Sequence, residues 1–109
     1  MEKEIVIMAK SYKKGGFCIA GINTETGDWI RPISQNVDKE GYVPSDDIKY
    51  EDGSEVKILD KVKISFLEHS PTKSQPENYI YDSDQYWKKT GESSIDEIIE
   101  FRGYDDVSK

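Results

Sequence analysis

Apolar runs along the chain predict a protein built mainly of β-strands. Residues 5–9 form a continuous run rich in β-branched residues, and Val62, Ile64 and Phe66 alternate with polar residues in segment 59–67. Two further strands are predicted at residues 17–23 and 28–33, separated by a turn sequence in which Gly27 takes the left-handed position. Three successive strands joined by short turns predict an antiparallel meander.

The second part of the chain has weaker periodicity. Segment 35–56 is rich in acidic residues and contains glycine and proline, so we expect a long loop that folds partly back on the strands through Tyr42, Val43, Ile48 and Tyr50. The sequence Lys-Lys-Thr-Gly at 88–91 is typical of a turn. Ser94, followed three residues later by Glu97, matches a capping box and predicts a short helix over residues 95–102.

Charge is distributed unevenly along the chain. The 109 residues carry a net charge of −7, with five basic against four acidic residues in 1–34 and ten against eighteen in 35–109. This balance argues against a protein that coats nucleic acid without selectivity, because such proteins neutralise phosphates with an excess of lysine and arginine. The acidic part is either a solvated surface or a surface for a basic partner.

The sequence contains no pattern typical of catalysis or metal binding. It lacks a phosphate-binding glycine loop, a dinucleotide fingerprint and a serine elbow, and the single His69 has no second histidine or nearby cysteine to complete a metal set. We therefore predict no catalytic residues, no cofactor and no metal. Because the sequence shows no signal-peptide pattern and no apolar run of membrane-spanning length, we expect a cytoplasmic protein without membrane association.

A basic turn supplies the first candidate binding residues, which are Ser11, Tyr12, Lys13 and Lys14. Two glycines follow them, and glycine can take positive φ or let another backbone come close. The lysines are mobile cations suited to an anion, and Tyr12 offers a ring for stacking. The alternative interpretation is an ordinary polar hairpin loop.

Trp29 and Arg31 are the next candidates, since alternate residues of a strand share a face. A tryptophan beside an arginine can stack on bases and contact phosphates, as in domains that hold single strands. The alternative is that Trp29 belongs to the core and that Arg31 pairs with an internal carboxylate such as Glu77. The two interpretations overlap, because an arginine held by a glutamate can still present its outer nitrogens to a ligand.

Gln75 and Asn78, on either side of Glu77, complete the set of candidate binding residues. An amide side chain can read a base edge through two hydrogen bonds, which suits recognition of one nucleotide. The alternative is that both amides cap a turn and satisfy buried backbone groups.

Four sequence blocks stand in a distinctive order and spacing. They are Ser-x-Lys-Lys-Gly-Gly-x-Cys-Ile-Ala-Gly, Thr-Gly-Asp-Trp-Ile-Arg-Pro-Ile-Ser, Leu-Asp-x-Val-x-Ile and Gln-Pro-Glu-Asn-Tyr-Ile-Tyr-Asp. Together they resemble the dual OB-containing domain family of bacteria over about residues 4–87. The resemblance implies a small OB-like antiparallel β-barrel and an association with nucleic acid, and the family brings no established catalytic residues. Its members carry a second barrel-like half, so we expect residues 1–109 to form a single OB-like barrel domain or the N-terminal half of a dual-barrel architecture.

These observations predict a mainly β fold, an OB-like barrel with a short C-terminal helix, acting as a non-enzymatic binding module. The expected ligand is single-stranded nucleic acid or a nucleotide. One alternative is an acidic protein-interaction module that engages a basic protein partner or mimics nucleic acid. Another is a barrel of the pseudouridine-synthase-and-archaeosine type that binds a modified base, which a deep aromatic-lined cavity would favour.

Overall fold

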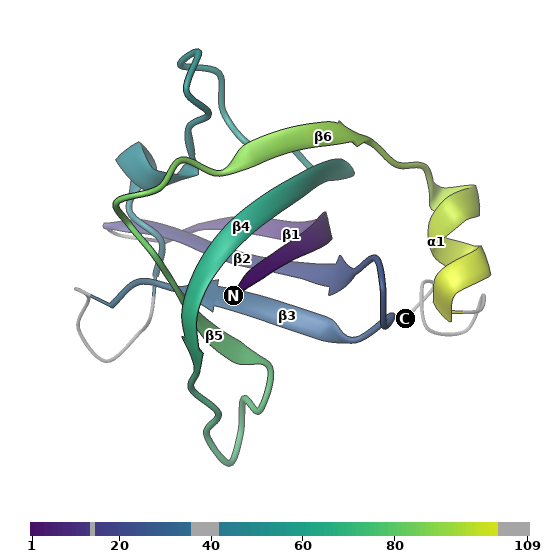
Figure 1. Ribbon diagram of the computed structural model, residues 1–109, viewed down its shortest axis with the longest axis horizontal. Helices are drawn as coiled ribbons and strands as arrows, with labels where there is room; N and C mark the ends of the chain where they lie inside the picture. The colour runs from purple at the N-terminus through teal and green to yellow at the C-terminus, as the bar shows by residue number, and fades with distance from the viewer. Residues whose placement is uncertain (14, 36–41, 103–109) are drawn as a thin grey trace.

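The computed structural model describes residues 1–13, 15–35 and 42–102, which contain six strands and two short helices (Figure 1). The strands are β1 (Glu2–Lys13), β2 (Gly16–Asn23), β3 (Trp29–Ile33), β4 (Asp60–His69), β5 (Asn78–Tyr81) and β6 (Lys88–Glu92). A 3-10 helix, η1 (Ser45–Ile48), lies between β3 and β4, and the helix α1 (Ile95–Arg102) follows β6. The prediction of a mainly β protein with a short C-terminal helix is confirmed.

Five of the strands close into a barrel. Neighbouring strands follow the order β1, β2, β3, β5, β4, and β4 pairs back onto β1. Figure 1 shows β4 as a long curved strand that crosses in front of β1, β2 and β3 and reaches both β5 and β6. The pairings are antiparallel except for β3 with β5, which run parallel from Arg31 and Asn78 to Ile33 and Ile80.

That parallel pair is the exception in a barrel whose other strand pairings are antiparallel. Parallel strands cannot be joined by a tight turn and need a crossover of a dozen or more residues. Here the crossover consists of the segment after β3, the whole of β4 and the connection 70–77. The initial meander is confirmed, because β1, β2 and β3 pair antiparallel in sequence order and Gly27 has a φ of 77°.

Two clusters of apolar side chains hold the fold together. The main core lies inside the barrel and includes Ile7, Ile19, Ile30 and Val62. Val43, Ile48, Tyr50, Val56 and Trp87 join this core from the connecting segments, which confirms that the loop after β3 folds back on the barrel. The smaller cluster lies on the outer surface, where Val6 and Ile22 contact Ile98 of α1.

One predicted turn is wrong, because residues 88–91 belong to strand β6. This strand pairs antiparallel with β4, with Lys63 opposite Lys88 and Asp60 opposite Glu92. Four of its five residues are exposed, so its sequence has no apolar alternation that would reveal a strand. Its extended conformation follows from pairing with β4, which the local sequence does not encode.

The start of α1 follows the predicted capping pattern in part. The Ser94 hydroxyl accepts a hydrogen bond from the Glu97 backbone N–H at 3.2 Å, whereas the Glu97 carboxylate accepts from the Ser93 hydroxyl. Within the residues that the structure describes, no helix has the length and apolar character needed to cross a membrane.

Candidate ligand-binding face

Strand register places most of the candidate residues on the outer surface of the barrel. Directly opposed residues of paired strands lie on the same face of a sheet. Trp29 is opposite Ile22, whose side chain belongs to the outer cluster, and Arg31 shares the face of Trp29 because strand side chains alternate. Arg31 is in turn opposite Asn78. We call this outer surface of β1, β2, β3 and β5 the strand face.

An arginine and two amides form a hydrogen-bonded group on the strand face. Arg31 Nη1 donates to Gln75 Oε1 at 3.3 Å and to Asn78 Oδ1 at 3.2 Å. Asn78 Nδ2 also donates to Gln75 Oε1 at 3.4 Å, and Asn78 is 4% exposed, whereas Arg31 and Gln75 remain partly exposed. We call these three residues the arginine–amide cluster. The parallel pairing of β3 with β5 brings together side chains that are more than 40 positions apart in the sequence.

Glu77 contributes to the same region through its backbone. The Arg31 backbone N–H donates to Glu77 O at 2.8 Å, which continues the β3–β5 ladder by one residue. The guanidinium, by contrast, contacts the amide oxygens of Gln75 and Asn78. Those amides therefore orient Arg31, which the sequence alone did not indicate.

The basic turn lies at the far end of β1. Gly15 has a φ of 95°, and a Cβ atom at Gly16 would lie 2.5 Å from Val43 O, so one glycine provides the turn and the other the close backbone approach. Ser11, Tyr12 and Lys13 are exposed, and Lys14 lies outside the described residues. Ser11 and Lys13 share the strand face by alternation, whereas Tyr12 points to the opposite face and contacts Phe17 edge to face, with ring centroids 5.5 Å apart.

The basic turn and Trp29 mark opposite ends of the strand face. Lys13 is opposite Gly16 and Trp29 is opposite Ile22, six positions further along β2. At about 3.3 Å per residue this corresponds to roughly 20 Å. Trp29 is 38% exposed and so retains a ring surface for contact with a ligand. The candidate residues therefore extend along the strand face, whose Ile22 end is partly covered by α1.

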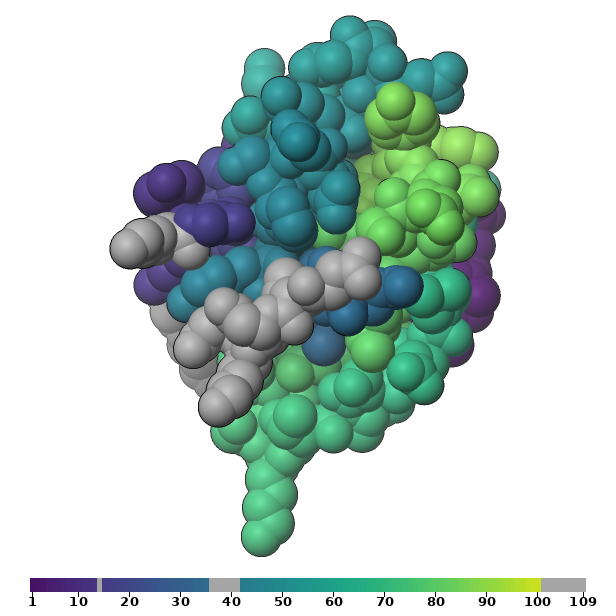
Figure 2. All heavy atoms as spheres, turned by 90° about the vertical axis from the view of Figure 1, so that its left-hand side faces the viewer, coloured from purple at the N-terminus to yellow at the C-terminus, as the bar shows by residue number. Residues whose placement is uncertain are grey.

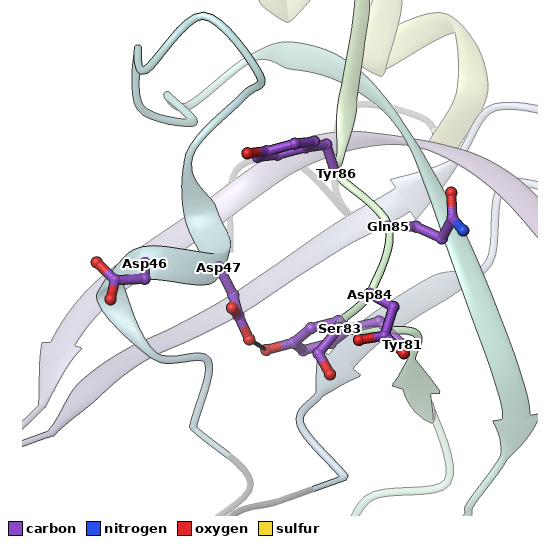
Figure 3. Close-up of a pocket in the computed structure, with 7 residues that line it drawn as sticks. All are labelled: Asp46, Asp47, Tyr81, Ser83, Asp84, Gln85 and Tyr86. Atoms are coloured by element: carbon purple, nitrogen blue, oxygen red, sulfur yellow. Dashed lines mark hydrogen bonds between the residues drawn. The ribbon is translucent and has the colours of Figure 1, made fainter.

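A pocket of about 340 Å³ at one end of the barrel was not anticipated from the sequence. Figure 3 shows that it lies between η1 and the segment after β5, with Asp47 pointing toward Tyr81, whose hydroxyl donates to Asp47 Oδ2 at 2.5 Å. Asp46 and Asp84 also line this hollow, which we call the acidic pocket, and no lysine or arginine of the described residues lines it. Segment 79–86 contains three tyrosines and two aspartates, but nothing in the sequence shows that they face residues 46 and 47.

The described residues offer no metal site, and the single histidine makes a structural contact. No three His, Cys, Asp or Glu side chains in this part of the chain gather in a way that could hold a metal ion. His69 stacks on Tyr79 with centroids 4.4 Å apart, and its Nε2 contacts Pro76 O at 2.7 Å. The histidine thus helps fix the connection that carries Gln75.

The fold and the comparisons agree on the class of protein. A closed five-strand barrel with β1 paired to β4 is an OB-type barrel. The family model described as the dual OB-containing domain matches residues 3–107, and the protein belongs to this family. No curated protein and no solved structure matches the chain. An OB-type family is one of binding modules, and the ligand has to be inferred from the surface itself.

Proposed function

We propose that this protein is a non-enzymatic module that binds single-stranded nucleic acid through the strand face. The observation that carries the proposal is the arginine–amide cluster, in which Gln75 and Asn78 hold the Arg31 guanidinium on the outer surface of the barrel. An oriented guanidinium contacts a phosphate or a guanine edge through two parallel hydrogen bonds. Trp29 lies two residues from Arg31 on the same strand and is partly exposed, so its ring is a surface on which a base can stack.

The location of the candidate residues within the barrel supports the same function. OB folds bind oligonucleotides on the face of strands 2 and 3 and on the loops between strands 1 and 2 and strands 4 and 5. In this chain, Lys13 borders the first of these loops, Trp29 and Arg31 lie on β3, and Gln75 lies in the second loop. A surface of roughly 20 Å suits a short single strand, at the lower end of the site sizes of OB folds.

Fluorescence anisotropy with labelled single-stranded DNA, single-stranded RNA and duplex DNA tests this proposal. We expect single strands to bind and duplex to bind weakly. Two cationic contacts, from Lys13 and Arg31, should lower single-strand affinity about 7-fold between 50 and 200 mM salt, given a slope near −0.7 per contact. Arg31→Ala should weaken binding about 5- to 150-fold, which corresponds to the loss of one bidentate contact.

Two further variants distinguish the effect of the forked guanidinium geometry on affinity from the effect of positive charge alone. Arg31→Lys keeps the charge but cannot form the fork, so we expect it to bind more weakly than the wild type. Lys63→Ala removes an exposed cation of β4, outside the strand face, and should bind like the wild type. If Arg31→Ala and Lys63→Ala bind equally well, the strand face is not the site. Absence of single-strand binding at 50 mM salt would instead favour the acidic protein-interaction module.

A further inference from the structure

A second pocket, of about 370 Å³, shares Tyr86 with the acidic pocket. It lies between the turn at residues 51–54 and the segment that leads into β6. Figure 2 shows this end of the barrel, with the teal segment after β3 and the light-green segment before β6 on either side of a furrow. The volume falls within the range of small-molecule sites. We call this hollow the aromatic pocket, because Tyr50, Tyr86 and Trp87 line it.

Trp87, which lines this pocket, has a buried polar atom without a hydrogen-bond partner in the part of the chain that the structure describes. Trp87 is 1% exposed, and its Nε1–H has no hydrogen-bond partner within the described residues. The indole N–H of a buried tryptophan usually finds an acceptor, and leaving it unpaired costs folding free energy. The atom is covered in the unbound protein, so an acceptor reaches it when a side chain of the pocket wall moves aside. Such movements of exposed side chains are fast.

A site for a planar ring needs a stacking surface as well as a hydrogen-bond donor, and Tyr86 supplies that surface. Its side chain is 56% exposed, although its neighbour Trp87 is buried. In Figure 3 the Tyr86 ring projects from the segment before β6 toward the chain that follows η1, and it lines both pockets. An exposed ring held beside a hollow is a surface on which a base can stack.

Charge distinguishes the aromatic pocket from its neighbour. Lys88 and Lys89 line it together with Glu51 and Asp52, so its charged residues balance. The acidic pocket has three aspartates and no described basic residue in its lining, and would repel a phosphate. Of the two hollows, the aromatic pocket is the one that can receive a base whose phosphate remains near a cation.

We propose that the aromatic pocket binds one nucleobase of a nucleotide, which stacks on Tyr86 and accepts a hydrogen bond from the Trp87 indole. This inference rests on the proposed function in taking nucleic acid as the ligand, and it adds a contact region away from the strand face. Each nucleobase carries an acceptor on its edge, so the pocket distinguishes bases by shape and stacking.

Nuclear magnetic resonance of the nitrogen-15-labelled protein tests the inference directly. The chain has two tryptophans, so two indole N–H signals are expected, and Trp29→Phe identifies that of Trp87. Uridine, cytidine, adenosine and guanosine monophosphates are titrated to millimolar concentration. We expect at least one nucleotide to shift the Trp87 indole proton downfield, as a new hydrogen bond forms. Tyr86→Ala should weaken that binding about 5- to 150-fold, the range for loss of one stacked base.

Matched variants make the outcomes distinct. Tyr12→Ala removes another exposed tyrosine that does not line the pocket, so it should leave the nucleotide-induced shift of the Trp87 indole signal unchanged. The inference is overturned if no nucleotide shifts the Trp87 signal, if Tyr86→Ala binds as well as the wild type, or if a lysine-arginine peptide shifts the signal where nucleotides do not. Nucleotide binding lost in Arg31→Ala but retained in Tyr86→Ala would overturn it while leaving the strand-face proposal intact.

Discussion

Two buried tyrosine hydroxyls donate to carboxylates near the two pockets. Tyr50 Oη donates to Asp60 Oδ2 at 2.7 Å, and Tyr81 Oη donates to Asp47 Oδ2. Burial, reinforced by the hydrogen bond to each carboxylate, raises the pKa of both tyrosines above the usual value of about 10. These bonds join the segment after β3 to β4 and to the end of β5, and so help shape the pocket walls.

Alkaline titration should reveal these two hydroxyls. Because their pKa is raised in the folded protein, the folded state keeps protons that the unfolded chain releases near pH 10. The corresponding stability is present in full below that pH and is lost as the pH rises above it. We expect tyrosinate absorbance to show at least two of the seven tyrosines unionised until circular dichroism reports unfolding. Complete ionisation of all seven near pH 10, with the fold intact, would contradict this assignment.

The individual site residues were predictable to different degrees. Trp29 and Arg31 could be placed on one face because alternation within a strand depends on local sequence alone. The arrangement of Arg31 with Gln75 could not be predicted, because it depends on parallel pairing between distant strands. The same limit applies to Asp47 and Tyr81, which share a hydrogen bond across 34 positions.

Among the elements, the start of β2 and the segment after β3 pack closely against each other. Phe17 and Val43 exchange two backbone hydrogen bonds of 2.8 Å, and this bridge brings the two backbones together at Gly16. A Cβ atom at Gly16 would lie 2.5 Å from Val43 O and 3.0 Å from Val43 C, both of which are backbone atoms. The close approach therefore has no flexible side chain that could yield.

Gly16→Ala should destabilise the protein by about 1–3 kcal/mol, the usual cost of overpacking. The added methyl group must separate the backbones and weaken the bridge between Phe17 and Val43. Urea unfolding followed by tryptophan fluorescence measures the change. Gly91→Ala is the matched control, since its Cβ would meet Lys61 Cδ at an ordinary 3.8 Å. Equal stability of the two variants would show that the close approach at Gly16 does not constrain the fold.

Strand prediction succeeded where one face of the strand is buried. In β4, Val62, Ile64 and Phe66 point into the core, and their alternation with polar residues predicted the strand. In β6 the residues are almost all exposed, so the strand had no such pattern. The order of strands around the barrel could not be predicted from the local sequence either, because β5 pairs with β3 only after β4 has crossed the barrel. Periodicity thus predicts elements, whereas long-range pairing decides how they assemble.

At the scale of the whole molecule, the net charge of −7 opposes binding to any polyanion. Nucleic-acid binding then requires that local cations outweigh the general repulsion at the point of contact. The proposed function therefore depends on where the positive charges lie. Two single charge reversals of equal effect on net charge, at different places on the barrel, test this dependence.

Lys13→Glu and Lys63→Glu both lower the net charge by two, but only Lys13 lies on the strand face. One exposed contact between a cation and a phosphate contributes about 1 kcal/mol, so reversing the charge changes the binding free energy by about 2 kcal/mol. This corresponds to roughly 30-fold in affinity. Lys63 belongs to β4 and is not among the candidate contacts, and at 100 mM salt charges are screened over about 10 Å, so Lys63→Glu should change affinity about 2-fold or less. Anisotropy with the same single strand measures both. Equal losses would show that net charge alone governs binding, and unchanged affinity in both variants would exclude the basic turn from the site.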